Sequence, residues 1–207
     1  MSRIKSVKSN KRRRRISISI DDDSTITLDN EVILKAGLRP GQEIDEKQIG
    51  KLKEADIEQR CLNAAKRFIG YRPRSESEVI NRLHKQGYER SLIDNVISKL
   101  KDANLVNDLE FANFWRDNRL SVNPKSKNLL KYELRRKGVR PEIAEEAISG
   151  LDDEAAATKA AEKKVRSIKS SDYPEFHDKL TNYLKWRGFN YEIIERICEN
   201  MWQKKRI

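Results

Sequence analysis

Residues 124–151 read PKSKNLLKYELRRKGVRPEIAEEAISGL, and the chain contains two further copies of this pattern, at residues 73–100 and 174–201. The three copies align without gaps. Their shared positions include the opening prolines Pro73, Pro124 and Pro174 and the glycines Gly87, Gly138 and Gly188. Only five prolines and eight glycines occur in 207 residues, so this agreement is not accidental. A period of about fifty residues predicts a repeat array whose units stack and bury one another's apolar faces.

The shared positions of each copy describe a pair of helices. Proline is favoured in the first turn of a helix, and glycine supplies the left-handed conformation that ends one. Ser75 and Glu78 fit a capping box at the start of the first copy. Ser126 matches Ser75 in the second copy, whereas Phe176 takes that place in the third. A second helix is expected to begin two or three residues past each glycine.

Another helical stretch precedes each pair. Residues 61–71, 108–120 and 154–168 carry apolar side chains three or four positions apart, which is typical of an amphipathic helix. Each repeat is therefore expected to contain three helices. The sequence predicts a mainly α fold of three tandem three-helix repeats, stacked in an elongated curved array. The expected boundaries are residues 58–104, 105–152 and 153–207.

Residues 1–57 have a different character. Residues 1–14 are rich in lysine and arginine and are expected to form a disordered tail. From Arg15 onward, isoleucines alternate with serines in the period-two pattern of a half-buried strand, and residues 25–28 fit a second strand. A short helix is expected from Asp29 to Lys35, ending at Gly37. Residues 15–57 are thus expected to form a small β-hairpin with a short helix.

The net charge of +11 is concentrated at the N-terminus. The chain carries 44 lysines and arginines against 33 aspartates and glutamates, and residues 1–20 hold eight bases and no acid. The remaining chain is almost balanced. A strongly basic segment favours nucleic acid or an acidic protein surface as a partner.

The second repeat is polarised within this balance. Seven bases lie between Lys125 and Arg140 with Glu133 as the single acid, and six acids follow from Glu142 to Glu154. Two interpretations stay open. The basic side chains could cover apolar surface and pair with the acidic neighbouring helix. Alternatively, they could contact phosphates or an acidic partner.

Sequence signals for catalysis, metal binding or a cofactor are lacking. Cys61 and Cys198 are expected to be buried thiols, and neither His84 nor His177 has a companion at zinc spacing. The aromatic residues Phe111, Phe114 and Trp115 could form a base-stacking platform, but their helical spacing favours core positions. Residues 21–23 lack the spacing of a calcium loop and fit a polar turn. No apolar run is long enough to cross a bilayer, and a cytoplasmic protein is expected.

These blocks of sequence resemble the RecX family of recombinase regulators. The resemblance runs from about Leu62 to Met201. It is carried by residues 71–79 with Gly87 and Tyr88, residues 105–108 with Phe111, Ala112 and Trp115, residues 124–126 with residues 133–138, and Tyr183 and Leu184 with residues 187–189 and Tyr191. One departure is Gln86, where a lysine is commoner in the family. The first repeat is for that reason a weaker basic candidate than the second.

The resemblance implies a non-enzymatic protein that binds the RecA recombinase and its single-stranded DNA filament. Such a protein limits filament growth, ATP hydrolysis and strand exchange. Direct contact with single- or double-stranded DNA is kept as an additional hypothesis, and a monomer without membrane association is expected. The candidate filament or nucleic-acid contacts are Arg72, Arg74, Lys125, Lys127, Lys131, Arg135, Arg136, Lys137, Lys185 and Arg187.

Two other function classes fit parts of this pattern. A helix-turn-helix protein would read bases in the major groove of duplex DNA, and it is retained as the alternative. A nuclease would need a cluster of carboxylates at metal spacing, which the sequence lacks.

Overall fold

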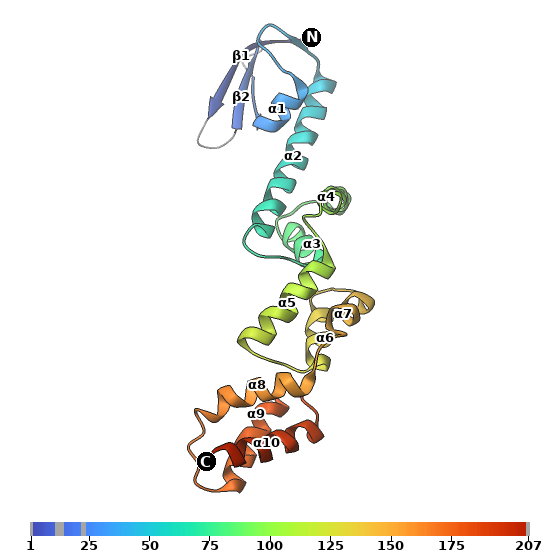
Figure 1. Cartoon of the computed structure of the whole chain (residues 1–207). Coiled ribbons are helices and arrows are strands. Elements are labelled where there is room, and N and C mark those ends of the chain that lie inside the picture. The colour runs from blue at the N-terminus through green and yellow to red at the C-terminus, as the bar shows by residue number, and fades with distance from the viewer. Residues whose placement is uncertain (1, 11–14, 22–23, 206–207) are drawn as a thin grey trace. The chain divides into compact units, whose positions relative to one another are not determined.

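The computed structural model describes residues 2–10, 15–21 and 24–205. The chain forms two compact units. We call Met1–Arg72 with Val79–Leu105 the N-terminal unit, and Pro73–Glu78 with Val106–Ile207 the C-terminal unit. Within the described residues, four strands and the first helices are followed by helices alone (Figure 1).

A four-stranded antiparallel sheet opens the N-terminal unit. The strands are β1 (Ser2–Asn10), β2 (Arg15–Ile20), β3 (Thr25–Asp29) and β4 (Glu43–Ile44), in the spatial order β3-β2-β1-β4. Alternate residues of β2 point to one face, where they form an apolar core with Ile4, Leu28 and Ile44. The helices α1 (Asn30–Ala36) and α2 (Glu46–Ile69) supply Ile33, Ile49 and Leu52 to this core and so cover that face.

The sequence predictions for this region were partly correct. Both hairpin strands and the short helix are confirmed: Asp29 caps α1 by accepting a hydrogen bond from the Glu31 amide, and Gly37 ends it with a φ of 62°. The disordered tail expected over residues 1–14 is wrong for Ser2–Asn10, which form β1, while residues 11–14 lie outside the described residues. The register of β1 shifts between Ile4 and Ser6, so its apolar residues do not alternate regularly.

The chain is helical on both sides of the domain boundary expected between residues 57 and 58. Helix α2 runs through it without interruption, from the capping box of Asp45 and Gln48 to Ile69. This one helix serves two purposes, since its first half covers the sheet and its second half carries the buried Cys61 and Ala65 of the first repeat.

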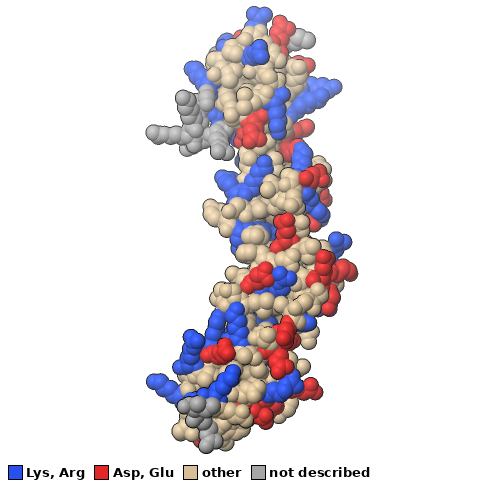
Figure 2. Space-filling model, viewed as in Figure 1, with Lys and Arg blue, Asp and Glu red and all other residues tan. Residues whose placement is uncertain are grey.

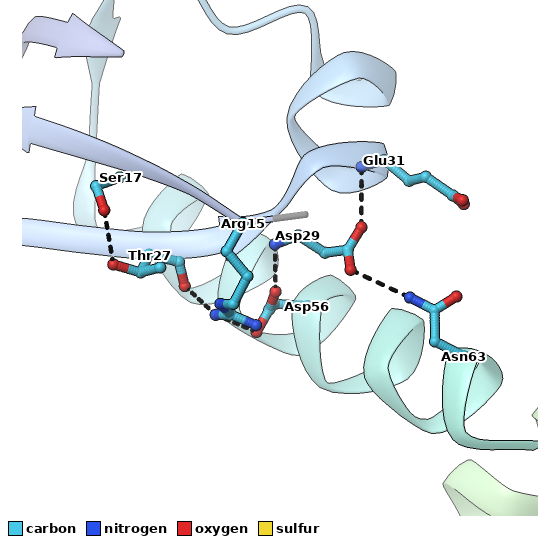
Figure 3. Close-up of polar contacts among 7 residues, drawn as sticks. All are labelled: Arg15, Ser17, Thr27, Asp29, Glu31, Asp56 and Asn63. Carbon is cyan, nitrogen blue, oxygen red and sulfur yellow. Dashed lines mark hydrogen bonds and ion pairs between the residues drawn. The ribbon is translucent and has the colours of Figure 1, made fainter. Parts of the chain in front are cut away.

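A buried polar network attaches the sheet to α2 (Figure 3). Asp56 is only 5% exposed, and its carboxylate accepts hydrogen bonds from the Asp29 amide at 2.6 Å and from Arg15 at 3.2 Å. Arg15 also donates to the Thr27 carbonyl, and Asn63 donates to the Asp29 carboxylate at 3.1 Å. Thr27 and Asp29 belong to β3, an edge strand of the sheet. These side chains therefore satisfy polar groups of an edge strand that would otherwise invite pairing with another chain.

The three expected three-helix repeats are confirmed. The remaining helices are α3 (Glu76–His84), α4 (Arg90–Asp102), α5 (Asp108–Val122), α6 (Lys127–Arg136), α7 (Pro141–Ile148), α8 (Asp153–Val165), α9 (Tyr173–Lys185) and α10 (Tyr191–Lys205). The first repeat consists of the second half of α2 with α3 and α4, the second of α5 to α7, and the third of α8 to α10. Each second helix of a pair begins three residues past its glycine, as predicted.

Each of the last two repeats encloses its own apolar core. Phe111, Leu130 and Leu134 are fully buried in the second repeat, and Phe176 and Leu180 are fully buried in the third. The glycines that end α3, α6 and α9 have φ values of 86°, 81° and 80°, which confirms the left-handed conformation predicted for them. None of the helices among the described residues has the length and apolarity that a membrane span requires.

Candidate nucleic-acid and filament interface

The C-terminal unit contains two equivalent contacts between successive repeats, which we call the first joint and the second joint. In the first joint, the turn after α6 packs on the start of α3. Ser75 donates from its hydroxyl to the Lys137 carbonyl at 2.6 Å, and Lys137 pairs with Glu78 at 2.8 Å. A Cβ atom added to Gly138 would lie 2.2 Å from the Ser77 Cβ atom, so the turn closes on the helix without room for a side chain.

The second joint repeats this arrangement one unit further along the chain. The turn after α9 packs on the start of α6, and the Ser126 amide donates to the Arg187 carbonyl at 3.0 Å. A Cβ atom on Gly188 would lie 2.7 Å from the Ser126 hydroxyl and 2.9 Å from the Leu129 Cβ atom. The shared prolines and glycines of the sequence thus mark a repeated contact as well as helix ends.

A second hydrogen bond recurs in both joints. The Glu76 amide at the start of α3 donates to the Asp108 carboxylate at 2.8 Å, and the Lys127 amide at the start of α6 donates to the Asp153 carboxylate at 2.8 Å. Asp108 and Asp153 are each the first residue of the long helix that opens the next repeat. Each carboxylate thus satisfies a backbone donor at a helix N-terminus, where negative charge is favoured.

The third repeat has no serine at this position. Phe176 takes the position of Ser75 and Ser126, and its ring is fully buried beside Trp202 with ring centroids 5.1 Å apart. The position that receives the neighbouring turn in the first two repeats thus belongs to the core of the third.

The two joints bring together most of the basic residues predicted from the sequence. Lys137 contacts the start of α3 directly, and Arg135 and Arg136 precede it in the last turn of α6. At the second joint, Arg187 lies beside Ser126, the N-cap of α6, which Lys125 precedes and Lys127 follows. Groups about sixty residues apart in the sequence are therefore neighbours. Arg72 belongs to the N-terminal unit, and both Arg72 and Arg74 are partly exposed.

The basic edge of α6 is divided between internal contacts and solvent. Lys131 pairs with Glu145 on α7, and Lys127 reaches the Ser149 carbonyl at 3.4 Å. This part of the edge makes the contact with the acidic neighbouring helix that one of the two interpretations expected. Arg135 and Arg136 are exposed, and the Arg136 guanidinium lies 5.8 Å from the centroid of the exposed Tyr132 ring.

Glu133, the single acid of this segment, lies at the centre of a partly buried ion cluster. It accepts hydrogen bonds from the Trp115 indole at 2.8 Å, from Arg119 at 2.9 Å and from Lys125. Burial by itself raises the pKa of Glu133, but these hydrogen bonds and the Arg119 charge outweigh it and hold the pKa below its ordinary value. Lys125 is therefore engaged in the structure of the second repeat.

Replacing Glu133 with glutamine is expected to lower the free energy of unfolding at pH 7 by about 1–2 kcal/mol, because Lys125 and Arg119 lose a charged acceptor. The pKa of Glu133 is lower in the folded than in the unfolded chain, so its stabilising effect is present above the unfolded pKa of about 4.3 and is lost as the pH falls through the folded value. The urea midpoints of the wild type and the glutamine variant should differ at pH 7 and should converge near pH 3. A difference that does not change with pH would contradict this role of the charge.

A basic cluster on the third repeat was missed from the sequence. Arg166, Lys204 and Lys205 line one shallow cavity together with Glu162, and Lys159, Lys163, Lys164 and Lys169 lie on α8 or shortly after it in the sequence. Figure 2 shows basic side chains beside α8 and acidic side chains over α7. Lys163 and Lys205 are exposed but donate to backbone carbonyls, and Lys159, Arg166, Lys169 and Lys204 are also exposed. Residues 163–166 contain three bases, and this run was the signal in the sequence that could have identified the basic residues of the third repeat.

The other residues considered for chemistry have structural environments. Cys61 and Cys198 are fully buried, as predicted, and burial raises the pKa of the Cys61 thiol to about 11. His177 contacts Glu195 at 3.0 Å. Phe111 is fully buried and the partly buried Trp115 contacts it with ring centroids 5.9 Å apart, so these two pack in the core as expected. Phe114 is 36% exposed, and the core position expected for it is wrong. No group of three or more potential metal ligands occurs within the described residues.

Three family models match consecutive parts of the chain. They describe the first, second and third three-helix domains of RecX, and they match residues 61–100, 107–148 and 152–198. Together these matches cover more than half of the chain and coincide with the three repeats.

Curated relatives and solved structures agree with these matches. The chain is 31% identical to regulatory protein RecX of Clostridium perfringens, over 99% of this chain and 100% of that protein. It is 30% identical to regulatory protein RecX of Bacillus pumilus, over 91% of this chain and 73% of that protein. A crystal structure of regulatory protein RecX has a TM-score of 0.74 at 21% identity, covering 96% of this chain and 100% of the other, and supports the fold. RecX from Lactobacillus salivarius has a TM-score of 0.59 at 27% identity, covering 70% and 97%.

Proposed function

Because the chain belongs to the RecX family of non-enzymatic regulatory proteins, we propose that it regulates the RecA recombinase by binding its filament on single-stranded DNA. Binding would limit filament growth, ATP hydrolysis and strand exchange. The name of the relatives supports a recombinase as partner, and the charge distribution supports contact with an anionic surface.

The observation that carries this proposal is the recurrence of basic residues at the two joints. Arg135, Arg136 and Lys137 lie at the first joint, and Lys185 and Arg187 occupy the matching positions at the second. Both joints lie within one compact unit, so one repeat separates two similar clusters of positive charge. A recombinase filament also presents its subunits and its DNA phosphates at regular intervals. A repeated basic surface suits such a repeating partner.

Reversing Arg135 and Arg136 to glutamate is expected to weaken filament binding by about tenfold or more, because like charges would then face the anionic partner. Both side chains are exposed, so the fold should be unaffected. Lys131 is left unchanged because it pairs with Glu145. The measurement is the concentration of the protein that halves the DNA-dependent ATP hydrolysis of recombinase.

The matched control replaces Lys47 and Lys51 with glutamate. These two lysines are exposed on α2 in the other unit, and their reversal changes the net charge by the same amount. This control should retain inhibition near the wild-type level. Equal inhibition by the Arg135 and Arg136 double variant and the wild type would show that these residues are merely solvated. Equal loss in both variants would indicate nonspecific attraction between polyions.

Two binding measurements address the partner itself. Retention of the chain by recombinase, with and without single-stranded DNA and nucleotide, should be greatest on the assembled filament. The helix-turn-helix alternative instead expects a preference of several kcal/mol among duplex sequences. Absence of binding to recombinase together with such a preference would replace the proposal by that alternative.

A further inference from the structure

Trp186 is 87% exposed, whereas Trp115 and Trp202 are partly buried. It stands at the C-terminal end of α9, in the turn that forms the second joint. Trp202 contacts the rings of Tyr173 and Phe176, and Trp115 contacts Phe111 and Glu133. The packing of the third repeat thus uses Trp202 and leaves the largest apolar side chain of the α9 turn in solvent. An exposed tryptophan at a defined position is a feature of binding surfaces.

The backbone around Trp186 is held by the fold. The Trp186 amide donates to the Asn182 carbonyl at 3.1 Å, and the Gly188 amide donates to the Lys185 carbonyl at 2.9 Å. The following residue, Arg187, accepts from the Ser126 amide of α6. Ordering this turn therefore requires no ligand, and the indole is presented from a preformed position, which reduces the entropy lost on binding.

The surroundings of the indole are polar and basic. A shallow cavity of about 380 Å³ lies beside it, lined by Leu129, Asn182, Lys185, Trp186 and Gly188. Leu129 is the single large apolar neighbour in this lining, so the indole is not the centre of an apolar protein-docking patch. The Lys185 ammonium is exposed, and Lys125 and Lys127 flank the Ser126 that contacts Gly188.

The matching position at the first joint strengthens this argument. Arg136 stands where Trp186 stands in the third copy, and it lies beside the exposed Tyr132 ring. Both joints therefore present a flat π surface next to a positive charge. This pairing suits a ligand that has flat bases and an anionic backbone, because stacking tolerates any base and the cations contact phosphates.

We propose that Trp186 stacks on an unpaired base of single-stranded nucleic acid while Lys185 contacts a neighbouring phosphate. Duplexes hide the base faces in their own stack, so the site should prefer single strands. This inference goes beyond the recombinase contact and does not depend on it, because it concerns nucleic acid without recombinase.

The test is a titration of tryptophan fluorescence with oligothymidylate at low salt. Addition of the oligonucleotide should quench the wild-type fluorescence, and this quenching should disappear in Trp186→Phe but persist in Trp202→Phe. Trp186→Ala should lower the affinity for oligothymidylate by about 5- to 150-fold, the range found when a stacking side chain is removed. Trp186 is almost fully exposed, so Trp186→Phe and Trp186→Ala should leave the urea midpoint almost unchanged.

Other ligands show whether the site selects the sugar, the single strand or a protein partner. Oligouridylate should bind similarly, because the stacking does not read the sugar, and a blunt duplex of equal length should bind more weakly and lose little affinity in Trp186→Ala. Unchanged affinity of Trp186→Ala for oligothymidylate would overturn the proposal, as would an equal loss on the duplex. Weaker binding of that variant to recombinase filaments, with unchanged binding to the free strand, would also overturn it and would make Trp186 a protein contact.

Discussion

Replacing Gly138 with alanine should lower the free energy of unfolding by about 2–5 kcal/mol. An alanine at a φ of 81° costs about 1–2 kcal/mol, because its Cβ atom approaches the following carbonyl oxygen. The new Cβ atom would also lie 2.2 Å and 2.5 Å from the Cβ and hydroxyl oxygen of Ser77, which adds the cost of overpacking, about 1–3 kcal/mol. Urea denaturation followed by circular dichroism and tryptophan fluorescence measures this loss. All three tryptophans belong to the unit that contains Gly138.

The matched control is Gly87→Ala. Gly87 holds the equivalent place in the first repeat with a φ of 86°, but a Cβ atom there would meet nothing within 4 Å. This variant should lose only the conformational part, about 1–2 kcal/mol, as judged by circular dichroism. If the two alanine variants lost the same free energy, the contact between Gly138 and Ser77 would contribute nothing to stability.

A double-mutant cycle isolates that contact. Ser77→Gly removes the atoms that an alanine at position 138 would strike, so the double variant should be more stable than the sum of the two single losses predicts. We expect a coupling of at least about 1 kcal/mol between these positions. Additive losses would show that the alanine is accommodated by other shifts.

The repeats could be predicted from the sequence because their signals are local. A proline, an apolar stripe and a glycine each act within one or two helical turns, so the helix pairs and their order were correct. The contact between Gly138 and Ser77 is different, because it joins residues about sixty positions apart. A single sequence does not distinguish a glycine that only ends a helix from a glycine that also lets another helix pack closely against it.

The differences at the N-terminus have an equally physical origin. Helix α2 continues past the predicted boundary because one helix covers the sheet with its first half and packs in the first repeat with its second. Strand β1 has few apolar residues, and the irregularity after Ile4 breaks their alternation. Its pairing with β2 and β4 is a tertiary effect that local periodicity does not encode.

The candidate site was predictable in composition but not in arrangement. Counting charges identified the bases of the second repeat, but it did not distinguish Lys131, which pairs with Glu145, from the exposed Arg135 four positions later. The exposure of Trp186 was equally hidden, since tryptophan at helical spacing usually enters the core. What separates these residues is which neighbouring helix lies beside them.

The other large effect is expected at Asp56, where replacement with alanine should destabilise the N-terminal unit by about 2–4 kcal/mol. The Asp29 amide, 2.6 Å from the Asp56 carboxylate, would lose its acceptor inside a buried site, and Arg15 would lose its ion pair. Removing one partner of a buried charged pair costs more than the pair itself contributes, because the other partner stays desolvated. Amide hydrogen exchange of β2 and β3 measures the effect, and the Asp29 amide should exchange about 30- to 1,000-fold faster.

Glu54→Ala is the matched control, because Glu54 lies on the same helix, carries the same charge and is exposed. It should leave the exchange of β3 within about twofold of the wild type, since exposed charges contribute little. Asp56→Asn should fall between the two, as its amide oxygen can still accept from Asp29 while the charge that holds Arg15 is gone. Unchanged exchange in Asp56→Ala would mean that the apolar face of the sheet alone holds it against α2. A graded response would instead show that the edge of β3 depends on a side chain 27 residues away, which accepts the hydrogen bond that a neighbouring strand would otherwise accept.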